Sequence, residues 1–216
     1  MELIGFPLKG NELCRFAIYL PKEVWYNLKQ TKDIFIREGL AIKTINFSKY
    51  LDKYEESSGL YPQDLMNIGG KYHKKSYLTK DELYQLAHLN STRSSYHVKK
   101  NPADRVEKVT KIAYGVEHDF SQLALYTSLK GIGVPTASAI LTSLNKDKHC
   151  VIDTRVWATL YSLDYFDKEK ESFKIEDYLK IIKIVRKMAK ETKYNIAEIG
   201  YALFAYDVAH REGNLH

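Results

Sequence analysis

The sequence predicts an all-α protein, because apolar residues recur at helical spacing along almost the whole chain and capping or helix-breaking residues separate the apolar runs. No internal repeat or low-complexity tract interrupts this pattern. With 216 residues, of which 44% are hydrophobic and 28% charged, the chain can bury a sizeable core. We therefore expect residues 1–216 to fold as a single compact unit, which could be divided into two lobes.

Composition narrows the class of protein. The chain carries 33 lysine and arginine residues against 27 acidic residues, and the net charge of +6 suits a polyanionic partner without requiring one. Cys14 and Cys150 are too few for a disulfide framework or a cysteine-rich metal site, and the seven histidines lack zinc-binding spacing. No segment reaches the roughly 18 apolar residues of a membrane span, and the N-terminus lacks the pattern of a signal peptide. We expect a cytoplasmic protein.

The N-terminal third is expected to contain two helices followed by irregular structure. Proline is favoured in a first helical turn and glycine after a last one, so a helix is expected from Pro21 to Glu38, with Gly39 ending it. A shorter helix is expected over residues 47–54. Residues 55–75 contain three glycines, two serines and a proline, a cluster typical of turns.

A capping box marks the next helix. Thr79 and Glu82 are three residues apart and can each accept a hydrogen bond from the other's backbone amide, with leucines following at helical spacing. Residues 90–101 are polar and basic and are expected to form a loop. Pro102 is expected to open a further helix. The apolar face of that helix comprises Val106, Val109, Ile112 and Ala113.

The remaining segments are also helical in pattern. Ser121 is expected to cap a helix, residues 175–191 to form a long basic amphipathic helix, and residues 195–210 a last helix rich in alanine and aromatic residues. This gives about eight to ten helices in total, at typical helix and connection lengths.

Two glycines with one residue between them lie between two helical segments at residues 121–145. Gly131 and Gly133 permit the backbone angles of a tight hairpin, and Pro135 is preset for the first turn of the next helix. The free amides and the positive end of that helix favour a phosphate group. The segment therefore predicts a phosphate-binding hairpin, with an ordinary tight turn as the alternative.

Asp153 stands where an apolar stretch ends and a helical pattern begins, within residues 151–163. Aspartate is a favoured N-cap residue, so Asp153 is expected to cap that helix. It follows Gly131 by 22 residues and could face the same groove as the hairpin. A plain structural cap is the alternative to a functional carboxylate.

Together, these two motifs resemble the helix-hairpin-helix superfamily of DNA glycosylases, in particular an endonuclease III-like branch without the iron–sulfur cluster. The family's hairpin pattern Leu-x-Gly-x-Gly-x-x-Thr-Ala recurs as Leu129, Gly131, Gly133, Thr136 and Ala137. The stretch Val-Ile-Asp-Thr-Arg-Val at residues 151–156 is similar to the family's Val-Asp-Thr-His-Val. Detailed resemblance covers about 35 residues, since the surrounding helices match only loosely.

The resemblance implies a two-lobed helical DNA glycosylase fold and the excision of a damaged or modified base from double-stranded DNA. The base is flipped out of the stack, and Asp153 is the catalytic carboxylate that stabilises positive charge on the sugar. The implied DNA-binding residues are Lys130, Gly131, Ile132, Gly133, Val134, Thr136 and Arg155. We also expect a monomer, associated with the nucleoid if its source is prokaryotic.

Three departures from the family pattern refine this expectation. Pro135 replaces the lysine with which strand-cleaving members attack the sugar, so we expect no lyase activity unless Lys130 or Lys99 reaches the site. Arg155 replaces the usual histidine and could pair with a phosphate or an acidic neighbour. No group of four cysteines follows the last helix, so we expect no iron–sulfur cluster and no metal ligands, although the hairpin could hold a monovalent cation.

Two alternatives stay open. Pro135 and Arg155 are compatible with a catalytically inactive helix-hairpin-helix module that only binds DNA. The basic charge and the 17 tyrosines would also suit an enzyme acting on RNA or nucleotides.

Several other residues are open to two interpretations or are assigned to the core. Tyr96 and His97 could form a wedge in the DNA or stack on the flipped base. We expect Trp157, Tyr161 and Cys150 to lie in the core. A group of basic residues fits a solvated surface as well as a DNA contact: Lys71, Lys74, Lys75, Arg93, Lys99 and Lys100.

Overall fold

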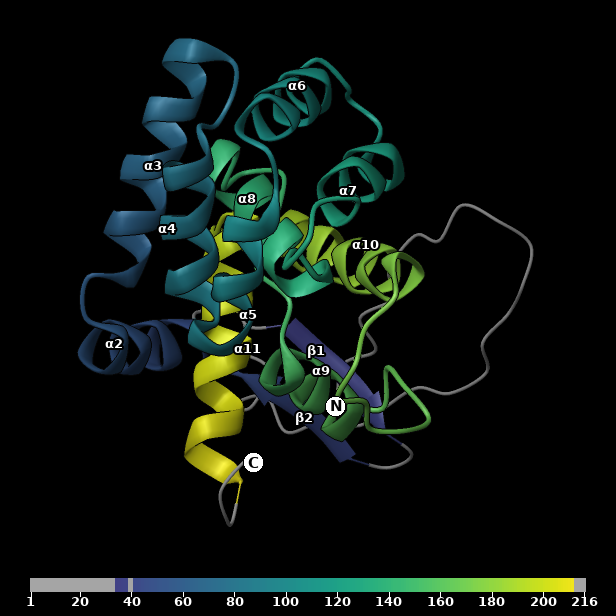
Figure 1. The fold of residues 1–216 in the computed structure, drawn as a ribbon. Helices are drawn as coiled ribbons and strands as arrows, with labels where there is room; N and C mark the ends of the chain where they lie inside the picture. Colours follow the sequence, from purple (N-terminus) through teal and green to yellow (C-terminus); the bar gives the residue numbers. More distant parts are fainter. Residues whose placement is uncertain (1–33, 39–40, 212–216) are drawn as a thin grey trace, which may run out of the picture. The chain divides into compact units, whose positions relative to one another are not determined.

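The computed structural model describes residues 34–38 and 41–211, most of which lie in helices (Figure 1). The first described helices are α2 (Phe47–Ser58), α3 (Tyr61–Lys75) and α4 (Lys80–Asn90). They are followed by the short α5 (Thr92–Ser95) and 3-10 helix η1 (Tyr96–Lys100), α6 (Ala103–Tyr114) and α7 (Asp119–Thr127). The last are α8 (Val134–Leu144), α9 (Thr154–Ser162), α10 (Ile175–Glu191) and α11 (Ile196–His210). The all-α prediction is confirmed for this part of the chain, apart from one pair of short strands.

The strand pair corrects the first predicted helix. Strand β1 (Ile34–Glu38) runs antiparallel to β2 (Ala41–Ile45), with Ile34 opposite Ile45. The helix expected from Pro21 to Glu38 is therefore wrong over its last five residues, and its earlier part lies outside the described residues. Isoleucine, phenylalanine and threonine favour strands, and their preference outweighs the helical spacing here.

Helix α3 corrects the irregular segment expected at residues 55–75. Pro62 occupies the first turn, where its missing amide costs nothing, and the helix runs on through Gly69 and Gly70. A β-carbon on Gly69 would lie 1.9 Å from the carbonyl oxygen of Ser143 in α8. Gly69 is therefore the residue that lets α3 approach α8 closely, and it does not mark a turn.

The loop expected at residues 90–101 is also wrong. It contains α5 and η1, in which the side chains of Ser95 and Val98 are buried. Their burial explains why this polar stretch is ordered, because two inward-facing residues attach it to the helices around it.

The remaining predictions for the described helices are confirmed only in part. The Thr79–Glu82 capping box is confirmed, with Glu82 N–H donating to Thr79 Oγ1 at 3.3 Å and Thr79 N–H to Glu82 Oε2 at 2.9 Å. Helix α7 begins at Asp119 and not after Ser121, whose hydroxyl lies 3.1 Å from Nδ1 of His118, the actual N-cap residue. Ile112, expected on the buried face of α6, is 52% exposed.

The core is built around α8 and α11. Helix α8 contacts α3, α4, α7 and α10, and α11 contacts α2, α9 and α10. All but two residues of α8 are buried, and the small side chains of Ala137, Ser138 and Ala139 let the neighbouring helices pack closely against it. Among the described helices, none has both the length and the apolar character needed to cross a bilayer.

Candidate functional site

The glycine hairpin lies between the end of α7 at Thr127 and the start of α8 at Val134. Gly131 has a φ of +83°, a value that residues with a β-carbon rarely adopt. A β-carbon at this position would also lie 2.7 Å from the amide nitrogen of Val98 in η1. Glycine is therefore required twice at position 131, for the turn and for the approach of η1.

The side chain of Asn101 holds the hairpin in place. Its Nδ2 donates to the carbonyl oxygens of Lys130 and Val98, each at 2.9 Å, and its Oδ1 accepts from the Lys130 amide at 2.9 Å. Asn101 is buried, so these bonds are shielded from competing water. The asparagine thus fixes the backbone just before Gly131 from both sides.

The start of α8 presents unpaired backbone amides. Pro135 lies in the first turn, as predicted, and the amides of Gly133, Val134 and Thr136 find no acceptor within the described part of the chain. Such amides, at the positive end of a helix, suit an anionic oxygen. The side chains of Ile132, Val134 and Thr136 are buried, so these residues could offer a ligand only their backbone.

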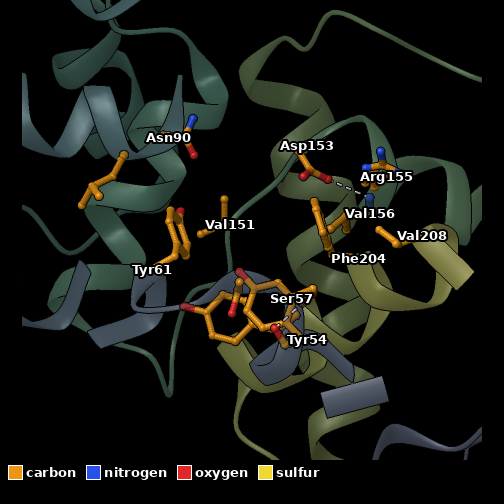
Figure 2. A pocket seen from close by; sticks show the side chains of 14 residues that line it. Tyr54, Ser57, Tyr61, Asn90, Val151, Asp153, Arg155, Val156, Phe204 and Val208 are labelled. Carbon is orange, nitrogen blue, oxygen red and sulfur yellow. Dashed lines mark hydrogen bonds between the residues drawn. The ribbon is translucent and has the colours of Figure 1, made fainter. Parts of the chain in front are cut away.

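Asp153 is the N-cap residue of α9, so the predicted helix cap is confirmed. Its Oδ1 accepts from the Val156 amide at 2.8 Å. The residue is half-buried and lines a pocket of about 390 Å³ (Figure 2). Asp153 forms no ion pair with any described residue, and Arg155 pairs with Asp207 instead, so the negative charge of Asp153 can act on a group in the pocket.

Four of the fourteen residues that line the pocket are aromatic. Figure 2 shows Tyr61 and Asn90 across from Asp153 and Arg155. The rings of Tyr54 and Tyr201 stack at 4.6 Å with an angle of 10° between their planes. The complete lining consists of Tyr54, Ser57, Ser58, Tyr61, Leu89, Asn90, Val151, Asp153, Arg155, Val156, Gly200, Tyr201, Phe204 and Val208. A flat, partly apolar ligand fits such walls, because it can pack against rings and bond at its edge.

Two hydrogen bonds join the pocket to the helix that follows the hairpin. The Ile152 amide, next to Asp153, donates to Ser138 Oγ in α8 at 2.9 Å. Asn90, which lines the pocket, places its Nδ2 3.4 Å from Thr136 Oγ1 in the first turn of α8. The hairpin residues themselves do not line the pocket, but α8 connects the two features directly.

Burial of Asp153 raises its pKa to about 6, and the negative charge of Asp207 adds to the increase. The amides of Val156 and Arg155 and the charge of Arg155 act in the opposite direction, because each stabilises the carboxylate. At neutral pH the carboxyl group of Asp153 is therefore an anion whose charge is only partly balanced by the nearby amides and by Arg155.

Arg155 points its charge toward an acidic neighbour. Its Nη1 donates to Oδ2 of Asp207 at 3.2 Å, and the guanidinium lies 5.5 Å from the ring centroid of Phe204. Asp207 is buried and also accepts from Nε of Arg211 at 3.0 Å. Asp207 thus draws Arg155 away from Asp153, while Arg155 keeps part of its surface in the pocket.

The pocket tyrosines remain neutral. Burial raises the pKa of Tyr54 and of Tyr61 far above the ordinary value, and it raises the pKa of Tyr201 to about 12. Their hydroxyl groups stay protonated at neutral pH and can donate hydrogen bonds to a ligand.

Other predicted residues lie apart from the pocket. Tyr96 is 64% exposed on η1, beside the hairpin, and His97 is exposed next to it. Lys130 is exposed, and Nζ of Lys99 lies 4.3 Å from the Tyr84 ring centroid, so neither lysine lines the pocket.

The core assignments and the basic surface gave mixed outcomes. Trp157 and Cys150 are buried, as predicted, whereas Tyr161 is exposed, because it lies on the outward face of α9. Lys75 pairs with Glu82 at 2.6 Å. The other basic residues considered for DNA contact are exposed: Lys71, Lys74, Arg93, Lys99 and Lys100. Among the described side chains, no group of three or more histidine, cysteine or acidic residues is placed to hold a metal ion.

Sequence reasoning missed most of the pocket. Tyr54, Tyr61, Tyr201 and Phe204 come from α2, α3 and α11, which are far apart in the chain. The sequence signals were the high tyrosine content and the aromatic residues of the last predicted helix, and neither says which rings gather around Asp153. Asp207 was missed as well, although it lies one turn before the end of α11.

Comparison with known proteins gives only distant similarities. No protein family model and no curated protein matches the chain. Among solved structures, it is similar to the Methanocaldococcus jannaschii 8-oxoguanine glycosylase/lyase in complex with a 15mer DNA containing 8-oxoguanine: 19% identity, 76% of this chain, 89% of that chain and a TM-score of 0.45. A structure of the 8-oxoguanine DNA glycosylase from the same organism gives 19% identity, 75% of this chain, 88% of that chain and a TM-score of 0.42.

Proposed function

We propose that the chain is a DNA glycosylase that removes a damaged or modified base from double-stranded DNA. One observation carries the proposal: the carboxylate of Asp153, which forms no ion pair with a described residue, lines a pocket whose wall is hydrogen-bonded to the helix that follows the glycine hairpin. A hairpin that holds a phosphate and a pocket that receives a flat ring are the two parts that such an enzyme needs. The sequence resemblance to helix-hairpin-helix glycosylases points the same way.

The chemistry follows from the charge of Asp153. As the bond between the sugar and the base breaks, the electron pair leaves with the base and positive charge develops on the sugar. A fixed anion nearby stabilises that charge and can orient the water that attacks the sugar. The Val156 amide holds Asp153 in one orientation, so little reorganisation is needed during the reaction.

Release of free base tests the proposal. Duplexes carrying oxidised, alkylated, deaminated or mispaired bases would be incubated with the protein, and the released bases separated by chromatography. Release from at least one substrate is expected. DNA binding without release from any of them would instead identify a catalytically inactive helix-hairpin-helix module.

We further propose that the enzyme is monofunctional and leaves an abasic site. No lysine lines the pocket within the described residues, and proline occupies the position of the attacking lysine in strand-cleaving relatives. Without an amine, no Schiff base can form with the sugar. Treatment of a reacting mixture with borohydride is expected to trap no protein–DNA adduct, and a trapped adduct would contradict the proposal.

Excision should lose activity in acid, because the reaction needs the Asp153 anion. With the pKa of Asp153 raised to about 6, the rate is expected to be constant above that pH and to fall about tenfold per pH unit below it. The Asp207→Asn change removes a negative charge and releases Arg155, so the acid limb should move to lower pH. Single-turnover rates measured across pH would check both curves, and an unmoved limb in the variant would contradict the assignment to Asp153.

A further inference from the structure

A basic surface on α10 shares no residue with the pocket or the hairpin. Lys183, Lys187 and Lys190 border a hollow of about 380 Å³, here called the α10 groove. Its remaining lining residues are Asp119, Leu179, Ile182 and Arg186. Nothing in the proposed excision chemistry uses this groove.

The groove carries an uncompensated positive charge. Arg186 pairs with Asp119, with Nη1 2.7 Å from Oδ2, and also donates to the Lys148 carbonyl, so this pair is neutral and structural. The three lysines are exposed and form no ion pair within the described part of the chain. Three positive charges around one hollow raise the local concentration of anions.

The spacing of the lysines suits an extended anion. Steps of four and three residues place Lys183, Lys187 and Lys190 on one face of α10. They span about 10 Å along the helix axis, a length over which duplex DNA carries roughly six phosphate charges. A row of charges of this length matches a polyanion better than a single small ion.

The surroundings favour nucleic acid over a membrane surface. The apolar face of α10, including Ile181, Val185 and Met188, is buried in the core. None of the exposed large hydrophobic residues in the described region lies on α10, so the helix has no apolar side to insert into a bilayer. Helix α7 runs from Asp119, in the groove, to the hairpin, over a length of about 13 Å.

We infer that the α10 groove is a second contact site for the phosphodiester backbone of duplex DNA, separate from the hairpin. The groove lies at the end of α7 that is farther from the hairpin, so the two contact sites would be separated by the length of this helix. This inference rests on the DNA-binding part of the proposed function and is independent of base excision.

Salt dependence of binding tests the inference. Binding of an undamaged duplex would be followed by fluorescence anisotropy at several salt concentrations, for the parent and for the triple variant Lys183→Gln, Lys187→Gln, Lys190→Gln. Loss of three phosphate contacts is expected to reduce the slope of log K against log salt by about two to three. Because all three side chains are exposed, circular dichroism melting should match the parent.

The control variant Lys49→Gln, Lys108→Gln, Lys111→Gln removes the same charge from exposed positions on α2 and α6. Its slope should change by less than about one. Equal slopes for the two triple variants would overturn the inference, as would a parent that does not bind DNA. The proteins would also be tested for binding to phosphatidylserine vesicles. If only the groove variant loses vesicle binding while its slope for DNA is unchanged, the groove is a membrane contact and the inference is overturned. If the salt-dependence slopes are as expected but no base is released from any duplex, the glycosylase proposal is refuted and the inference about the α10 groove stands.

Discussion

We expect the Asp153→Asn protein to bind damaged duplex DNA as the parent does but to release the base at least about 100-fold more slowly. Asparagine is nearly the same size and can still cap α9, because its side-chain oxygen can accept from the Val156 amide. Only the negative charge in the pocket is lost. Single-turnover release on the best substrate from the base panel, together with anisotropy on the same duplex, would measure both quantities.

The matched control is Asp147→Asn, which removes the same charge from an exposed residue that does not line the pocket. Its release rate should equal that of the parent. If the Asp153→Asn protein excised every substrate at the parent rate, Asp153 would be a helix cap only, and the glycosylase proposal would have to be abandoned.

The Gly69→Ala change is expected to lower the free energy of unfolding by about 3 kcal/mol. The added β-carbon would lie 1.9 Å from the carbonyl oxygen of Ser143 and 2.6 Å from its carbonyl carbon. Both atoms belong to the backbone of α8, so no side-chain rotation can relieve the overlap and the two helices must move apart. Urea denaturation followed by circular dichroism would measure the loss.

Gly70 provides the comparison, since it is the next residue of the same helix and a β-carbon there would meet nothing within 4 Å. Gly70→Ala should raise the free energy of unfolding by roughly 0.5–1 kcal/mol, because alanine loses less backbone entropy in a helix. Similar effects of the two changes would show that the close approach of α3 and α8 does not govern stability at Gly69.

These two glycines also show where sequence reasoning reached its limit. Local patterns locate features that depend on neighbouring residues, and so the Thr79 capping box, the Asp153 cap and the long helix α10 were predicted correctly. The meaning of Gly69 depends on Ser143, which is 74 residues away, and no local pattern distinguishes a packing glycine from a turn glycine.

The pocket also combines residues that a local motif reveals with residues that only tertiary packing brings together. Asp153 and the hairpin were found because each sits in a short motif, and their connection was expected from the family resemblance. The aromatic walls come from α2, α3 and α11, and any of the 17 tyrosines could have filled those places. Tertiary packing selects Tyr54, Tyr61 and Tyr201, so only a structure could identify them.

The Asn101 side chain both donates to and accepts from the Lys130 backbone, and this should affect the rate at which the protein associates with DNA. A turn that already has its bound geometry loses little conformational entropy when a DNA strand binds to it. Association should therefore proceed in a single step at a rate set by diffusion and charge, without a slow rearrangement after the first encounter.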